Sequence, residues 1–179
     1  MSTPRSFRRI ASGLVVGLAA WRAAPAAAQA PIQVAFVTPI QLVPQQQAVR
    51  GVRVDLLYGS NPAVQGFDIG LVNQTTRGPS SGVQLGLANL VTGDFTGLQY
   101  GFVNTTSGRV EGLQTALVNV AGSGEGMQWG LFNSNREMNG LQLALVNYAE
   151  RIHGVQVGLV NIIRSGGQFP VFPIVNWGK

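Results

Sequence analysis

Apolar and polar residues alternate along most of this chain, in short segments that repeat. The period within a segment is two, which is typical of a β-strand, because successive side chains of a strand point to opposite faces. Such repeats indicate an array of similar supersecondary units. Eight segments begin with glycine at intervals of 14 to 16 residues, at positions 51, 66, 82, 97, 112, 126, 140 and 154. Residues 170–177 have the pattern of a truncated further copy.

Each copy has one apolar face and one face that is polar at its centre. The second, fourth and sixth positions are almost wholly apolar, for example Val83, Leu85 and Leu87. The opposite face carries glycine, a polar residue, a small residue and then valine or alanine, and asparagine ends the copy. These shared positions define the structural repeat, which is clearest at Gly82, Gln84, Asn89, Gly97, Gln99, Asn104, Gly154, Gln156 and Asn161.

Short turn-like segments between the copies, such as 92–94 and 107–109, predict hairpins. A strand from about 34 to 42 and the tail bring the total to roughly ten strands. We therefore expect an all-β fold, an antiparallel β-meander that closes into a barrel, since closure removes unpaired strand edges. With leucines outward and the glycine-glutamine face inward, this would be an outer-membrane barrel with a tight, small-residue interior.

A β-solenoid is the alternative fold. Three apolar positions per strand span roughly 14 Å, whereas a membrane barrel presents an apolar band about 25 Å tall. If each copy of 14 to 16 residues were instead one solenoid turn with leucines inside, glutamines and asparagines would stack in ladders. Two features argue against this alternative: a polar return segment at 149–151, and glycine or alanine at the fifth position, which it does not explain.

The early copies carry charge at the glutamine position. Arg53 and Asp68 replace glutamine there, and Asp55 lies two residues beyond Arg53. Charges of both signs on one face of adjacent strands predict an interior ion cluster, which a wet barrel interior tolerates. Asp55 and Asp68 could form a general acid-base pair, but Arg53 makes a structural ion pair the simpler interpretation.

The first 28 residues have the three parts of a secretory signal. Arg5, Arg8 and Arg9 precede an apolar run at 10–20, and small residues follow at 23–30. Cleavage after Ala28 would leave residues 29–179 as a single β-repeat domain. Both the general secretory route and the twin-arginine route stay open. The sequence thus predicts export.

Charge and composition then exclude several function classes. Four of the twelve basic residues precede residue 30, and the other eight are balanced by seven carboxylates, so the exported part has a net charge of about +1 and no basic stripe for nucleic acid. The chain has no cysteine. Its single histidine, His153, lies at a strand edge where other copies have serine, threonine, glutamate or asparagine. We expect no catalytic residue, no cofactor and no metal site, and hence no enzyme.

The repeats also resemble a known family, the bacterial surface-repeat proteins first named from spirochaetes. The resemblance covers about residue 35 to the end: Thr-Pro-Ile-Gln-Leu-Val-Pro at 38–44, the segment 49–59, the Gly-Leu-Gln-x-Gly-Leu-Val-Asn copies and the tail at 169–177. It implies an exported, outer-membrane or surface-exposed repeat protein without a defined activity. A weaker likeness is to curli fibre subunits, whose repeats share Gln-x-Gly-x-x-Asn, as at 84–89.

Two functional hypotheses follow. The first is a structural outer-membrane or cell-surface protein, with a small pore if the glutamine-lined interior holds water, whose partners are outer-membrane lipid or cell-surface components. The second is a soluble, surface-exposed or secreted β-solenoid that acts as an adhesive, binding or fibre-forming module. Neither hypothesis involves a small-molecule substrate, and the sequence predicts no particular oligomeric state.

Overall fold

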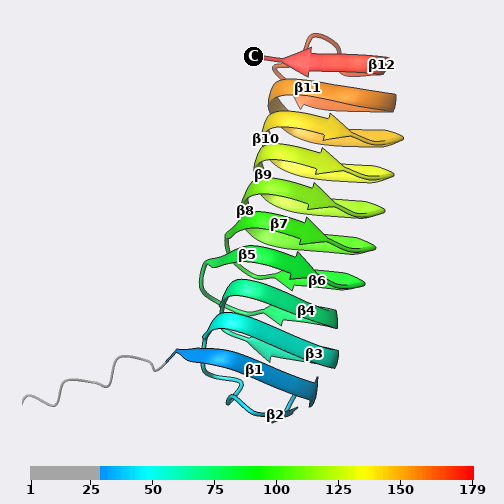
Figure 1. Ribbon diagram of the computed structural model, residues 1–179. Coiled ribbons are helices and arrows are strands. Elements are labelled where there is room, and N and C mark those ends of the chain that lie inside the picture. Colours follow the sequence, from blue (N-terminus) through cyan, green and yellow to red (C-terminus); the bar gives the residue numbers. More distant parts are fainter. Residues whose placement is uncertain (1–28) are drawn as a thin grey trace, which may run out of the picture.

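Residues 29–179 are described by a computed structural model, in which they form a β-solenoid (Figure 1). The predicted signal peptide lies outside the described residues. The strands are β1 (Ala30–Val37), β2 (Ile40–Gln41), β3 (Val49–Asn61), β4 (Val64–Thr75), β5 (Ser80–Leu85), β6 (Ala88–Val91), β7 (Phe95–Tyr100), β8 (Val103–Thr115), β9 (Val118–Trp129), β10 (Phe132–Leu143), β11 (Val146–Ser165) and β12 (Val171–Gly178).

Successive copies of the repeat stack in parallel and in register. β5 pairs with β7 so that Gly82 lies opposite Gly97, and Gln84 opposite Gln99. β6 pairs with β8 in the same way, and Asn89 lies opposite Asn104. Each copy is therefore one coil, and each repeat position lies next to the same position in the coils on either side.

One coil consists of two arms joined by two corners. β5 is the first arm and β6 the second, and the corner between them lies at 86–87. The second corner, at 92–94, leads into β7, the first arm of the next coil. From β8 to β11 a single continuous strand runs through this second corner, from the second arm of one coil into the first arm of the next.

The core between the two arms is narrow and half polar. Each coil directs four side chains inward, as in Phe95, Gln99, Asn104 and Thr106, all of which are buried. The glutamine and asparagine lie at the centre, and the two flanking positions are small or apolar except where Asn61 and Asn135 occupy them. In the last coils these flanking positions form an apolar cluster of Met138, Ala149, Ile152 and Ile163.

The expected antiparallel barrel is wrong. The sheet order β12-β11-β10-β9-β8-β7-β5-β4-β3-β1-β2 is almost wholly parallel, and the sheet does not close on itself. The segments predicted as hairpins, 92–94 and 107–109, are corners of coils. A period of two is common to a barrel strand and a solenoid arm, so it did not distinguish the folds, whereas in-register parallel pairing needs near-identical copies, which this chain has.

The solenoid alternative is confirmed as a fold, but the predicted direction of the leucines is wrong. Leu87, Phe102 and Leu117 are exposed, while the glutamines and asparagines are buried. The small fifth position also has a reason: it lies at the first corner, where a Cβ on Gly86 would come within 2.6 Å of Asn73 Nδ2. The polar return is accommodated, because Ala149 points inward while Arg151 is exposed.

The leading glycine of each copy permits the close stacking of coils. Gly97 has φ +131°, and a Cβ built on it would lie 2.1 Å from the carbonyl oxygen of Gly82 in the preceding coil. Only glycine fits a backbone of this conformation at this distance.

Both ends of the stack are covered by an antiparallel strand. β12 pairs antiparallel with β11 and carries Pro173, and the short β2 pairs antiparallel with β1 (Figure 1). Among residues 29–179 the parallel pairing therefore stops at both ends.

Candidate functional site

The glutamine ladder is the first of two hydrogen-bonded columns inside the solenoid. Each glutamine donates from Nε2 to Oε1 of the glutamine in the preceding coil, for example Gln99 to Gln84 at 2.8 Å and Gln114 to Gln99 at 2.7 Å. The column ends on a carboxylate, because Gln84 donates to Asp68 Oδ2 at 2.8 Å. The members of the glutamine ladder are Gln84, Gln99, Gln114, Gln128, Gln142 and Gln156.

The asparagine ladder runs beside it with the opposite polarity. Asn89 Nδ2 donates to Asn104 Oδ1 of the following coil at 2.8 Å, and to the main-chain oxygen of Tyr100 at 2.9 Å. Donors thus point toward the C-terminal end in this column and toward the N-terminal end in the glutamine ladder. The members of the asparagine ladder are Asn73, Asn89, Asn104, Asn119, Asn133, Asn147 and Asn161.

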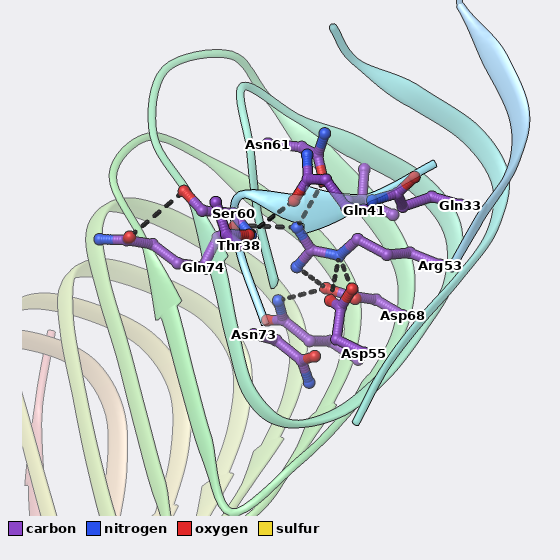
Figure 2. A network of polar contacts seen from close by, with 12 residues as sticks. Gln33, Thr38, Gln41, Arg53, Asp55, Ser60, Asn61, Asp68, Asn73 and Gln74 are labelled. Carbon is purple, nitrogen blue, oxygen red and sulfur yellow. Dashed lines mark hydrogen bonds and ion pairs between the residues drawn. The ribbon is translucent and has the colours of Figure 1, made fainter. Parts of the chain in front are cut away.

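Arg53 continues the glutamine column toward the N-terminal end (Figure 2). The guanidinium is fully buried, and its Nε and Nη2 donate to the two carboxylate oxygens of Asp68 at 2.6 and 2.8 Å. Nη1 donates to the main-chain oxygen of Gln74 at 3.0 Å. A buried charge is tolerated only when it is paired and hydrogen bonded, and this bidentate pair meets that condition.

Asp55 lies in the same network but has a different environment. Its Oδ2 is 3.0 Å from Arg53 Nε, whose single proton is directed at Asp68, and neither oxygen of Asp55 accepts a hydrogen bond. Burial raises the pKa of Asp55 from 3.8 to about 6; Arg53 opposes the rise, and the nearby Asp68 carboxylate adds to it. Folding therefore favours the protonated form of this carboxyl group.

The outward positions of the first corner form a continuous apolar surface, which we call the apolar ridge. Its crest is exposed, with 49% of Leu87 and 57% of Phe102 accessible to solvent. Tyr100 and Trp129, on the outer face of the first arm, and Val103 and Phe132, on the second arm, extend the ridge to both sides. The crest consists of Leu57, Leu71, Leu87, Phe102, Leu117, Leu131, Leu145 and Leu159, one from each of eight coils.

A shallow groove lies on this ridge. It has a volume of about 500 Å³ and is lined by Leu71, Leu85, Leu87, Tyr100, Phe102 and Leu117 with the corner glycines between them. Nearly all of its lining is therefore apolar.

The second corner is charged, and we call it the charged edge. Arg109 pairs with Glu125, and Arg151 with Glu137, in adjacent coils. About half of each of these side chains is exposed, and such surface pairs contribute little stability. A groove of about 530 Å³ runs along this edge. The charged edge comprises Asp94, Arg109, Glu125, Arg136, Glu137, Glu150 and Arg151.

The predicted repeat positions lie together in this architecture. Gln84, Gln99 and Gln156 belong to the glutamine ladder, and Asn89, Asn104 and Asn161 to the asparagine ladder. Gly82, Gly97 and Gly154 form a third column, in which each glycine lies opposite the next. Arg53, Asp55 and Asp68 form one buried network, and His153 is exposed on β11.

Two members of the buried columns were missed in the sequence. Gln33 of β1 lies opposite Arg53 and is fully buried, so it occupies the glutamine column although no copy begins there. Gly59 takes the asparagine position of the first coil, opposite Asn73. The space is filled by the Asp55 side chain, since a Cβ on Gly59 would lie 1.5 Å from Asp55 Oδ2. The first copy has no asparagine at this position, so alignment of the copies would not have revealed this exchange.

The expected outer-membrane barrel with a pore is wrong. The space between the arms is filled by the buried glutamine, asparagine and apolar side chains and encloses no channel lined by exposed glutamine. Among residues 29–179, no three His, Cys, Asp or Glu side chains are grouped so that they could hold a metal ion. No helix in that range is long and apolar enough to span a membrane.

Comparison with known proteins gives no relative. No protein-family model, no curated protein and no solved structure matches this chain. The resemblance to bacterial surface-repeat proteins therefore stays an expectation from the sequence motifs.

Proposed function

We propose that this chain is a non-catalytic structural module, a rigid β-solenoid that is exported to the cell surface and binds through its outer surface. The two amide ladders are the observation that carries this proposal. In both ladders, the interior amides of successive coils are hydrogen bonded to one another. Such a stack is a scaffold rather than a reactive site. Repeat proteins of this shape commonly bind through extended surfaces.

The buried charges support the same function. Arg53 and Asp68 are bound to each other and inaccessible to solvent, so they stabilise the fold without meeting a substrate. What remains for contact with other molecules is the apolar ridge and the charged edge.

A fibre-forming module is the second candidate, favoured by the in-register ladders, which are typical of cross-β stacks. The ends of the stack favour a single rod instead. β12 carries proline at the outermost strand and β2 has two residues, and both short edge strands and proline are known devices against edge-to-edge pairing.

Surface labelling of intact cells tests the proposal. The full chain with a C-terminal epitope tag is expressed in a Gram-negative host, and antibody binding and protease accessibility are measured before and after permeabilisation. We expect labelling of intact cells and release of the tag by external protease. A periplasmic protein that is cut by the same protease only after permeabilisation is the matched control. Tag retained in the cytoplasm or periplasm would contradict the proposal.

A further inference from the structure

The outer surface of the solenoid divides sharply into an apolar half and a charged half. Between the leading glycine and the residue after asparagine, no copy has a charged residue at an outward position; Arg53, Asp55 and Asp68 in that part of the repeat are buried. The exposed ion pairs lie at the second corner, on the charged edge. The solenoid is thus amphipathic along its length, as is an amphipathic helix that lies in a membrane interface.

The apolar ridge is large for a surface exposed to water. Coils stack about 4.8 Å apart, so eight of them extend for roughly 38 Å. Around the ridge, two arm faces of about 7 Å each and a crest of about 10 Å give a perimeter of roughly 24 Å. The resulting area is about 900 Å², whereas the largest apolar patch of an ordinary soluble monomer is about 300–600 Å². A surface of this size indicates a binding partner.

The shape of the ridge distinguishes between partners. It is convex, with apolar side chains on the crest (Leu117), on the first arm (Trp129) and on the second arm (Phe132). A second copy seated on the crest or on one arm would cover about 400 Å² at most, which is half of the roughly 800 Å² per partner that a stable interface buries. A fluid lipid surface would cover all three sides at once.

We infer that the apolar ridge is a membrane-docking surface, which inserts into the headgroup and upper acyl region of a phospholipid layer while the charged edge faces water. This inference rests on the proposed function, because it names the partner of that surface. The ridge carries no lysine or arginine, so the attraction is hydrophobic and needs no anionic lipid. Binding to zwitterionic vesicles that persists at high salt is the expected signature.

Vesicle flotation tests the inference. The chain from Gln29 to Lys179, which contains every strand of the solenoid, is mixed with phosphatidylcholine vesicles with and without 0.5 M salt. We expect the chain to float with the vesicles under both salt conditions. Replacing three crest residues with serine (Leu117→Ser, Leu131→Ser and Leu145→Ser) removes exposed apolar surface, and we expect at least about a 10-fold loss of partitioning.

The matched control lies in the same part of the solenoid on the opposite edge. Arg109→Ser, Arg136→Ser and Arg151→Ser together remove three charges, and we expect unchanged flotation. If this control instead abolishes binding, or if only anionic vesicles bind and salt releases them, the charged edge is the contact and the inference is overturned.

Fluorescence gives a second readout that does not depend on the crest variants. Trp177→Phe leaves Trp129 as the only tryptophan after residue 28. We expect the fluorescence emission of Trp129 to shift to the blue when vesicles are added, and to be quenched by brominated lipid. A folded chain that shows neither effect would overturn the inference, as would a dimer in sedimentation velocity that the crest variant dissociates in the absence of lipid binding.

Circular dichroism and cooperative unfolding separate this inference from the proposed function. A folded chain that does not float refutes lipid docking alone. A chain without β-structure refutes the solenoid module itself.

Discussion

Asp55 lies at the N-terminal end of the asparagine ladder, where we expect it to act as a donor only when it carries a proton. Asn73 Oδ1 is buried without a hydrogen-bond donor, because the first coil has Gly59 where later coils have asparagine. Both Asp55 and Asn73 lie against Gly70, where a Cβ would be 3.0 Å from Asp55 Cβ and 2.7 Å from Asn73 Oδ1. A protonated carboxyl group is a donor, whereas a carboxylate accepts only. When Asp55 is neutral, the network also contains one buried cation, Arg53, and one buried anion, Asp68.

This environment makes stability depend on pH in a defined direction. Because the folded pKa of Asp55 is about 6 and its usual value is 3.8, the folded chain binds the proton more tightly than the unfolded chain. The contribution of the protonated Asp55 to the free energy of unfolding is full below pH 3.8 and is lost as the pH rises through 6. We expect Asp55→Asn, which keeps a donor at every pH, to raise the free energy of unfolding at pH 7 by about 1–2 kcal/mol.

Urea unfolding of both proteins at pH 4, 5.5 and 7 provides the measurement. The gap between Asp55→Asn and the unsubstituted chain should be small at pH 4 and widest at pH 7. Asp94→Asn, at the exposed charged edge, is the control and should track the unsubstituted chain. A variant less stable than the parent at all three values would mean that folding requires the Asp55 carboxylate beside Arg53.

At the scale of the element, the coil depends on one position where backbone meets backbone. The leading glycines stack directly on each other, with Gly82 opposite Gly97 and Gly97 opposite Gly112. Neighbouring main chains therefore leave no room for a side chain, and the backbone has a positive φ that L-residues rarely adopt. No rotamer change relieves such a contact, because the obstructing atoms belong to the main chain.

Gly97→Ala should accordingly disrupt the stacking of its coil. The new Cβ would lie 2.1 Å from the carbonyl oxygen of Gly82, so we expect a loss of about 3 kcal/mol or more in the free energy of unfolding. Thr96→Ala, the exposed neighbour on β7, should change it by less than about 0.5 kcal/mol. Thermal and urea unfolding compare the two, and equal stabilities would show that the coils do not stack as tightly as described.

At the scale of the whole molecule, the end strands limit how far the stack extends. A parallel solenoid coil has unpaired N–H and C=O groups on its last strand, and an uncovered edge of this kind invites further copies. β12 occupies that edge on β11, and a cluster of Phe169, Phe172 and Trp177 holds the tail in place, with the two phenylalanine rings 4.4 Å apart.

Removal of residues 166–179 should convert the single rod into fibres or large oligomers. The truncation exposes the edge of β11 together with the last members of both ladders, Gln156 and Asn161. Electron microscopy and thioflavin fluorescence are the measurements, and Val171→Thr, an exposed change that keeps β12 paired, is the control. A truncated chain that stays monomeric and folded would show that β12 does not limit assembly.

Much of this architecture was predictable from the sequence, and the errors have physical causes. The period of two and the copies starting at 82, 97 and 154 correctly gave all-β structure and the stacking positions. The barrel prediction placed the glutamine face inward, but the solenoid alternative placed the leucines inside, since buried amides are costly when considered one at a time. In a parallel stack most of these amides are bonded to the coil above or below, which removes most of the cost.

A signal for the correct direction was nevertheless present. Amide side chains that bond to one another inside the stack must match their neighbours. Glutamine recurs unchanged at 84, 99 and 114, while the fourth position changes from Leu85 to Tyr100 to Thr115. A polar residue that recurs unchanged in this way indicated a hydrogen-bonded ladder in the interior. The exchange of Gly59 and Asp55 depends on side-chain geometry that no linear pattern contains.

The opposing directions of the two amide columns bear on how such a chain can lengthen. A column of aligned amides adds to its dipole with every coil, and one column alone would build up partial charge at the two ends of a long stack. Here each coil contributes a pair of amides whose dipoles largely cancel. Duplication of an internal copy of 14 or 15 residues would extend the stack by one coil at almost no electrostatic cost. Gene duplication can thus change the number of coils while the strands that cover the two ends stay the same.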